Sequence, residues 1–344
     1  MKKLLIMAAV AATFASCSTD NEDFVTQNEP QKIVFDAPVM NMGTRAGAIT
    51  NATYPEAESF KVFANRHTGT YNGSWASNFM NGVDVSKVNT QQYWAPTQDY
   101  YWPKNGDMIT FAAYSPANLT AATDCESVAY EATGLNVVGY KLNADLAQQK
   151  DLMFAPRVMN KTKDNSSTGV AIKFNHALSL INFTVKSANS GITITDIIVN
   201  NAKDKGTFNE GITDGATYKI GDPDATVKPA WTGQEFQNTS SSTFNVFKGT
   251  QNVTQNATEA TVGGNLLMIP QDVNGSTITI KWKYTNGGSN VVLDEVTKNF
   301  RDLDISAWEI GKKYTYNITI NLDKIYFNPS VDNWGNGGTG DIQP

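Results

Sequence analysis

Apolar and polar residues alternate along much of the chain with the two-residue period of a β-strand. Between Tyr314 and Leu322, single Thr or Asn residues separate the apolar ones. Because successive side chains of a strand point to opposite faces, this stretch predicts a strand with one buried and one solvated face. Shorter runs with the same period occur at 109–111, 170–174, 181–185 and 278–284.

Helical periodicity is almost absent. Only residues 142–149 have the character of a short helix, and no long apolar stripe recurs every 3.6 residues. Charged residues make up 17% of the chain, below the usual quarter or so, and Thr, Asn, Ser and Gly take their place. No short repeat is found, which excludes solenoids and propellers. The sequence therefore predicts an all-β protein built from half-buried strands.

The 344 residues are enough for two domains of ordinary size. A polar loop at 161–167 is followed by a strand that ends at Phe174, so we expect a domain boundary near 175–180. The prediction is two tandem β-sandwiches, residues 46–177 and residues 178–344, the second ending in a flexible tail.

Residues 1–17 have the pattern of a bacterial lipoprotein signal peptide. Lys2 and Lys3 precede an apolar run that is too short to span a membrane. Small residues stand immediately before Cys17, as in a lipobox, although Phe14 occupies its first position. We expect acylation of Cys17, which would attach the mature chain to membrane lipid. The alternative is an ordinary signal peptide that carries a cysteine.

Residues 18–45 are expected to form an acidic tether and one short strand. The acidic, Ser/Asn-rich start cannot bury itself, and acidic residues after a lipidated cysteine resemble surface-export signals of Gram-negative lipoproteins. The strand follows, with its apolar residues at Ile33, Val34, Phe35 and Val39.

Arg45 lies between two glycines, directly after that strand. Gly43 and Gly47 predict an exposed loop, and exposed loops are where proteases cut. Cleavage between Arg45 and Ala46 would release the strand. The alternative is a plain loop arginine in a surface protein that is not cleaved.

Charge and cysteine content narrow the functional classes. The formal net charge is -6, and no basic stripe is present, which excludes a nucleic-acid partner. The chain has two cysteines. If Cys17 carries lipid, Cys125 has no partner, so we expect no intramolecular disulfide.

Catalytic chemistry has few candidates. The two histidines, His67 and His176, lie far apart in sequence, and no nucleophile-elbow motif is found. Acidic neighbours would raise the pKa of Cys125 and so would not activate its thiol. We therefore expect no active site, no metal and no cofactor.

Several motifs are spread along the chain: YYWPKNG at 100–106, ITFAAYSP at 109–116, DLMFAP at 151–156, FNHALSLINFTV at 174–185, LLMIPQ at 266–271 and AWEIGKKYTYNITI at 307–320, followed by Trp334. Taken in this order, they resemble the fimbrillin family, in particular its Mfa-like branch of type V pilus subunits. No single motif is decisive, but together they cover nearly the whole chain after the leader.

The resemblance implies a pair of transthyretin-like, Greek-key β-sandwiches on the outer membrane, exposed at the surface as part of a fimbrium. It also implies maturation by an arginine-specific surface protease, for which Arg45 is the matching position. Removal of the first strand would open a groove that a C-terminal strand of another pilus subunit fills. The donor candidate here contains Ile325, Phe327 and Val331, in a register left open, as is the choice between stalk, anchor and tip subunit.

A second interpretation is a non-polymerising surface lipoprotein that binds a host glycan or protein. Exposed aromatic rings can stack on sugars or protein partners, and Trp75, Trp94 and Trp102 are the candidates. Core packing is the other explanation for these tryptophans.

Overall fold

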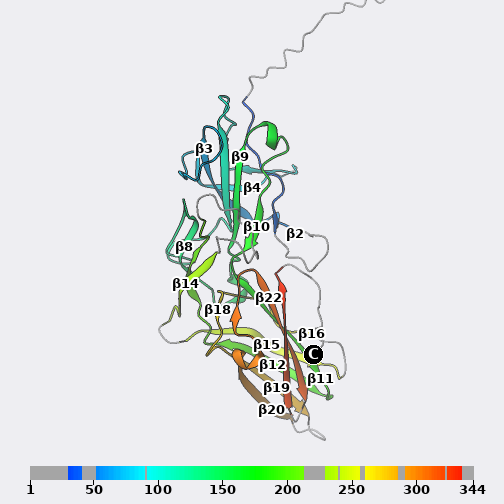
Figure 1. The fold of residues 1–344 in the computed structure, drawn as a ribbon. Coiled ribbons are helices and arrows are strands. Elements are labelled where there is room, and N and C mark those ends of the chain that lie inside the picture. Colours follow the sequence, from blue (N-terminus) through cyan, green and yellow to red (C-terminus); the bar gives the residue numbers. More distant parts are fainter. Residues whose placement is uncertain are drawn as a thin grey trace, which may run out of the picture.

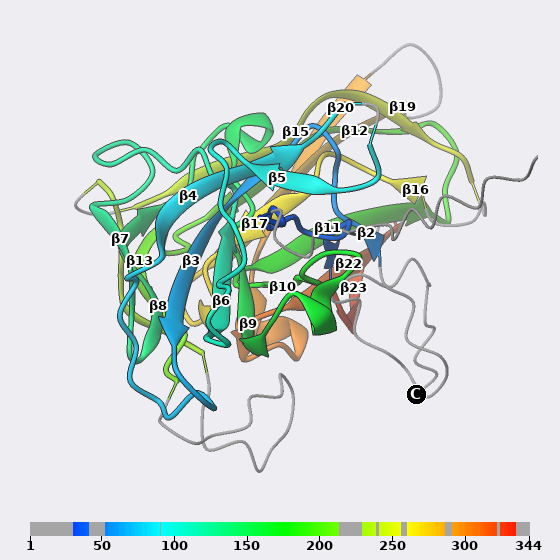
Figure 2. The same ribbon diagram turned by 90° about the horizontal axis from the view of Figure 1, so that it is seen from above.

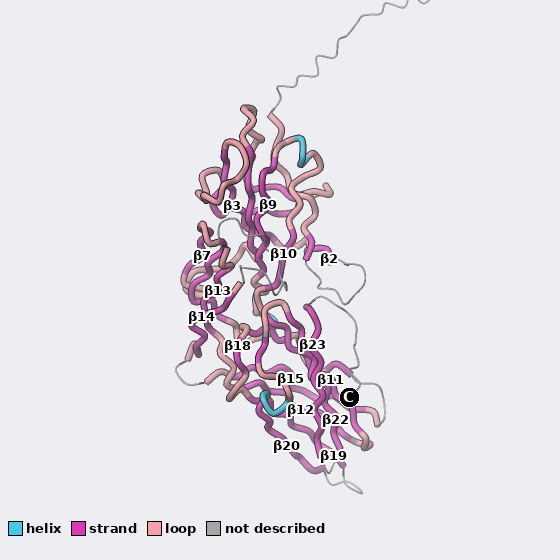
Figure 3. Tube along the Cα trace, in the orientation of Figure 1, coloured by secondary structure: helices cyan, strands magenta, loops and turns pink. Residues whose placement is uncertain are grey.

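The fold comes from a computed structural model, which describes residues 30–40, 52–89, 91–212, 229–238, 241–255, 260–285, 291–321 and 324–334. The molecule is elongated, with β3 and β9 near one end and β19 and β20 near the other (Figure 1). The prediction of an all-β protein is confirmed. Helix within the described residues is confined to three 3-10 turns (Figure 3): η1 (Leu146–Gln148), η2 (Asp164–Ser166) and η3 (Phe300–Leu303).

An eight-stranded sheet forms the end of the molecule that contains β3 and β9. Both of its faces are buried, because residues that alternate along β3 and β6 belong to two different apolar cores. In spatial order its strands are β2 (Ala52–Thr53), β1 (Val39–Met40), β10 (Lys173–His176), β9 (Met153–Lys161), β6 (Met108–Ser115), β3 (Ser59–His67), β4 (Met80–Lys87) and β5 (Trp94–Pro96).

A four-stranded sheet packs against one face of the eight-stranded sheet. The rings of Phe63 and Tyr130 stack with centroids 5.5 Å apart, and those of Phe154 and Phe208 lie 5.1 Å apart. The strands of this second sheet, in order, are β14 (Ala230–Glu235), β13 (Lys205–Asn209), β8 (Gly134–Lys141) and β7 (Ser127–Glu131).

Two further sheets form the opposite end of the molecule around a shared apolar core. β22 shows why these residues form strands: Tyr314, Tyr316, Ile318 and Ile320 are buried, and the Thr and Asn residues between them are not. One sheet has the order β16 (Ala260–Thr261), β11 (Ser179–Ser187), β22 (Lys312–Asn321) and β23 (Lys324–Asn333), with β17 (Leu266–Met268) beside β11. The other has the order β15 (Thr243–Val253), β12 (Ile192–Asn200), β19 (Thr277–Thr285) and β20 (Val291–Asn299), and β18 (Gln271–Asp272) pairs with β21 (Ala307–Trp308).

Strands from both sides of the boundary predicted at residues 177/178 pair in one sheet. That point does fall between β10 and β11, but β13 and β14 come later in the sequence and pair with β8. Their aromatic residues hold them there: the ring of Trp231 lies 5.7 Å from Tyr140 and 5.5 Å from Phe208. A division of the sequence into two consecutive segments therefore does not describe β13 and β14.

Candidate functional site: the seam closed by residues 31–40

Residues 31–40, here called the N-terminal segment, lie against β5 and the loop that follows it. The N–H of Ile33 donates to Tyr100 O over 2.8 Å, and Phe35 and Trp94 exchange two backbone hydrogen bonds of 2.8 Å. Phe35 pairs antiparallel with Trp94. One side of the segment is thus bonded as a strand would be.

The other side of the segment is bonded to the residues that lead into β10. Val170 donates its N–H to Val34 O (2.9 Å), Asp36 donates to Val170 O (3.2 Å), and Val39 donates to Ile172 O (3.2 Å). β5 and β10 belong to opposite halves of the strand order, so the segment closes the seam between them (Figure 2). One short segment therefore turns an open sheet into a closed one.

The side chains of the N-terminal segment fill the core inside this closed sheet. Ile33 and Phe35 are buried, whereas Val34 and Val39 are half-buried. The ring of Phe35 meets Phe60 and Phe111 edge-on, at 5.8 Å and 5.6 Å between centroids. Loss of the segment would remove two large apolar residues from the centre of the core.

Gly169 allows the backbone of the N-terminal segment to lie close to the residues that lead into β10. Its φ of +140° lies in the region that favours glycine, and a Cβ at this position would stand 2.7 Å from both the N and the Oδ1 of Asp36. Any larger residue would collide with the backbone of the segment. This glycine was not identified from the sequence, because only the fold brings residues 36 and 169 together.

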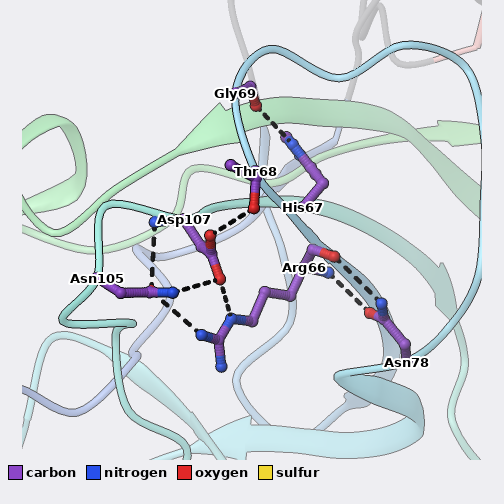
Figure 4. A network of polar contacts seen from close by, with 7 residues as sticks. All are labelled: Arg66, His67, Thr68, Gly69, Asn78, Asn105 and Asp107. Carbon is purple, nitrogen blue, oxygen red and sulfur yellow. Dashed lines mark hydrogen bonds and ion pairs between the residues drawn. The ribbon is translucent and has the colours of Figure 1, made fainter.

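A polar network braces the turn that follows Trp102, on the β5 side of the seam (Figure 4). Arg66 Nε donates to Asp107 Oδ2 over 2.7 Å, and its Nη2 donates to Asn105 Oδ1 over 3.1 Å. Thr68 Oγ1 donates to Asp107 Oδ1 over 2.8 Å. Hydrogen bonds from Asn105, Thr68 and Arg66 lower the pKa of Asp107, so its carboxylate stays charged and holds the turn.

The chain has four arginines, and two of them are held by the fold. Arg66 lies in β3 within the network above. Arg157, in β9, lies over the rings of Tyr71, Trp75 and Tyr130 and donates to Tyr130 Oη over 3.1 Å. Arg301 lies exposed in η3. Arg45 and Ala46 lie outside the described residues, as does Cys17.

β23 contains the donor-strand candidates and lies at the end of its sheet. It pairs with β22 along ten residue pairs, from Lys312↔Asn333 to Asn321↔Lys324, and with no other strand among those the structure describes. Ile325 and Phe327 are half-buried, while Tyr326 and Val331 are exposed by 51% and 38%. The strand is therefore held from one side only.

Two of the three candidate ligand-binding tryptophans are core residues. Trp94 and Trp102 are only 1% and 5% exposed, inside the closed sheet. The ligand-binding interpretation is wrong for these two and core packing is the explanation that holds, because the ring of Trp94 lies against Tyr54 and Phe60 and that of Trp102 against Phe111. Trp75 is half-buried, and the guanidinium of Arg157 lies 4.8 Å from its ring centroid.

Two features bear on attachment and reactivity. Cys125 is buried, and burial, with a smaller effect of Asp124, raises the pKa of its thiol. The described part of the chain contains no helix long and apolar enough to cross a membrane.

Known proteins with similar sequences and folds are described as fimbrial or as cell adhesion proteins. The sequence is 24% identical to fimbrium subunit Fim1C of Phocaeicola vulgatus, over 99% of this chain and 98% of that protein. The fold is similar to the crystal structure of a fimbrial protein from Bacteroides vulgatus (TM-score 0.60, 16% identity, 88% of this chain and 99% of that one). It is also similar to that of a candidate cell adhesion protein from Bacteroides uniformis (TM-score 0.51, 18% identity, 88% and 99%).

The family model described as "Fimbrillin-like" matches residues 44–334, which include β23 and the β5 and β10 walls of the seam but begin after the N-terminal segment. The ordered motifs, the all-β architecture and this match over most of the sequence agree, and the chain belongs to the fimbrillin-like family.

Proposed function

We propose that this chain is a structural subunit of a cell-surface fimbrium that serves adhesion. It is exported as a lipoprotein acylated at Cys17 and held at the outer membrane until an arginine-specific protease cuts after Arg45. Subunits then join by insertion of a C-terminal strand into the seam that the N-terminal segment leaves. Membership of the fimbrillin-like family supports the fimbrial role, and the geometry of the seam supports the mechanism.

The observation that carries this proposal is that Ile33 and Phe35 are buried within the N-terminal segment, whose backbone is hydrogen-bonded on both sides. Burying a large apolar side chain stabilises by about 1.5 to 3 kcal/mol, so these two side chains contribute several kcal/mol. The whole stability of a domain is only about 5 to 15 kcal/mol. A chain that has lost the segment therefore gains much by binding a replacement.

The vacated seam would also present unpaired backbone groups. Tyr100 O, Trp94 N and O, and Val170 N and O all bond to the segment. An incoming strand can satisfy these groups while its alternate side chains fill the pockets of Ile33 and Phe35, as in β-strand addition. An open edge of this kind is a site of polymerisation.

Of the four arginines, Arg45 and Arg301 remain as candidate sites for an arginine-specific protease. Arg66 and Arg157 lie inside strands, and their guanidinium groups donate hydrogen bonds to neighbouring residues. Arg301 is exposed but lies in η3, far in sequence from the seam. Among cuts after the four arginines, only a cut after Arg45 would separate the N-terminal segment without also detaching β3.

The alternative of a non-polymerising, ligand-binding lipoprotein receives less support. Trp94 and Trp102 are buried, so of the three candidate tryptophans only Trp75 retains partial exposure. A broad aromatic platform for a glycan is not formed by these residues. No second function is therefore proposed.

The test uses protein without its leader, folded and then treated with an arginine-specific protease. We expect a cut after Arg45, release of the N-terminal fragment and formation of SDS-resistant ladders. Arg45→Ala should remain intact and monomeric, and the matched variant Arg301→Ala should behave as the unmodified protein does. Complete cleavage after Arg45 without ladders, or ladders from Arg45→Ala, would contradict the proposal.

A further inference from the structure

β23 repeats the sequence of the N-terminal segment. Residues 32–39 read KIVFDAPV and residues 324–331 read KIYFNPSV. Lys, Ile, Phe and Val occupy equivalent places, and Asp36 corresponds to its near-isostere Asn328. The two stretches lie at opposite ends of the sequence and belong to different sheets, so the agreement does not come from a shared local structure.

The equivalent residues also point the same way. Ile33 and Phe35 are buried in one core, and Ile325 and Phe327 pack against the other. On the other face, Lys32 is exposed and Val34 and Asp36 are half-buried, whereas Tyr326 and Asn328 on the outer face of β23 are exposed. Each stretch therefore presents an Ile and a Phe, two residues apart, on its inward face.

The backbone of β23 can supply every hydrogen bond that the seam receives from the segment's N–H groups. The donors in the segment are the N–H groups of Ile33, Phe35, Asp36 and Val39, and their equivalents all have N–H groups. Pro329, which has none, corresponds to Ala37, from whose N–H no hydrogen bond is found within the described residues. The proline thus falls where the seam requires no donor.

From this agreement we infer that β23 is shaped for the seam of a second copy of this same chain, in one register. Ile325 takes the place of Ile33, Phe327 that of Phe35, and Val331 that of Val39. The inference rests on the proposed function and adds to it the partner and the alignment. The chain is self-complementary and forms a homopolymer.

The environments of the two sites favour this transfer. In its own sheet β23 is bonded along one edge, and its Ile and Phe are only half-buried. In the seam a strand is bonded on both sides, and the same two side-chain types are almost completely buried. A strand that moves from the first site to the second gains apolar burial and a second set of hydrogen bonds.

A disulfide can report the register. Lys32 and Tyr101 are antiparallel bridge partners, and both side chains are exposed. In the inferred register, residue 324 of an incoming strand stands opposite residue 101. The probe is a synthetic peptide of residues 324–334 with Lys324→Cys, which contains no arginine and so survives the protease. It is added to leaderless Tyr101→Cys protein during cleavage after Arg45.

We expect a disulfide between peptide position 324 and protein position 101, identified by mass spectrometry, in most of the cleaved protein. The same peptide with Phe327→Asp should lose at least ten-fold of this cross-link, and a peptide with Tyr326→Cys in place of Lys324→Cys should form little. An intact protein with Lys32→Cys and Tyr101→Cys should form an internal disulfide, which verifies the geometry of the pair.

The alternative results separate this inference from the proposed function. Preferred cross-linking by the Tyr326→Cys peptide would overturn the register while strand exchange stands. No cross-link from any peptide, with ladders still formed by the cleaved protein, would overturn β23 as the donor. Absence of both cross-links and ladders after complete cleavage would overturn the inference together with the proposed function.

Discussion

The imidazole ring of His176 stacks on the indole ring of Trp334, with centroids 3.8 Å apart and planes 9° apart. Asp151 Oδ2 lies 2.8 Å from His176 Nδ1 and holds the edge of the ring. Trp334 directly follows β23, whereas His176 ends β10. The end of the candidate donor strand is therefore fastened to the sheet that contains the seam, and release of β23 must separate these two rings.

Removing this contact should loosen β23. An aromatic pair contributes about 0.5 to 1.5 kcal/mol beyond its buried area, so Trp334→Ala should lower the free energy of opening of β23 by at least that amount. Hydrogen exchange is the measurement, and faster exchange along β22 and β23 is the expected result. Trp75→Ala, which alters another half-buried tryptophan, should leave this exchange unchanged. Equal protection of β23 in Trp334→Ala would show that the stack does not hold the strand.

Much of the fold could be predicted from the period of the sequence, since burial alternates along each strand. The Tyr314 to Ile320 stretch of β22 is an example. Strand pairing between distant segments leaves no such pattern, which is why β13 and β14 were expected in the second sandwich although they pair with β8 and its neighbours. The fit of Gly169 against Asp36 and the stack of His176 on Trp334 also depend on contacts that only the folded chain creates.

Gly169→Ala should displace the N-terminal segment. The new Cβ would collide with Asp36, and the positive φ adds backbone strain of about 1 to 3 kcal/mol. Gly275→Ala is the matched control, because Gly275 has φ +85° and a Cβ added there would meet no atom within 4 Å, so this variant suffers the strain alone. We expect lower stability in urea and faster cleavage after Arg45 for Gly169→Ala than for Gly275→Ala. Equal behaviour of the two variants would mean that Asp36 can move away freely.

The stability of the protein should decrease as the pH rises towards neutrality because of Glu210. Burial raises the pKa of this carboxyl to about 7, against which a hydrogen bond from Leu135 N–H and the charge of Arg157 act. The protonated form stabilises fully below the ordinary pKa of a glutamate, and this stabilisation is lost as the pH rises through about 7. The loss is on the order of 3 kcal/mol.

Glu210→Gln keeps an acceptor for Leu135 N–H and cannot ionise. The variant should therefore lack the decrease in stability between pH 4.5 and 7, and should exceed the unmodified protein in stability above pH 7. Urea denaturation across this pH range is the measurement. Glu295→Gln, at an exposed position of β20, serves as the control for the loss of one carboxylate. An unchanged pH dependence in Glu210→Gln would refute the assignment.

Phe35→Ala should harm the intact subunit more than Phe327→Ala does, and Phe327→Ala should harm the polymer more. Phe35 is completely buried, so Phe35→Ala should destabilise the uncut protein by about 3 to 5 kcal/mol. Phe327 is half-buried at a sheet edge, so Phe327→Ala should cost the uncut protein roughly half of the 1.5 to 3 kcal/mol of full burial. After cleavage the order reverses, because Phe35 has left with its segment whereas Phe327 must fill the vacated pocket.

Urea denaturation measures the effect on the intact subunit, and ladder formation on gels measures the effect on the polymer. Phe35→Leu, which keeps most of the side-chain volume, provides a folded comparison if the alanine variant unfolds. Normal ladders from Phe327→Ala, or their loss in Phe35→Leu after cleavage, would contradict the exchange of one phenylalanine for the other.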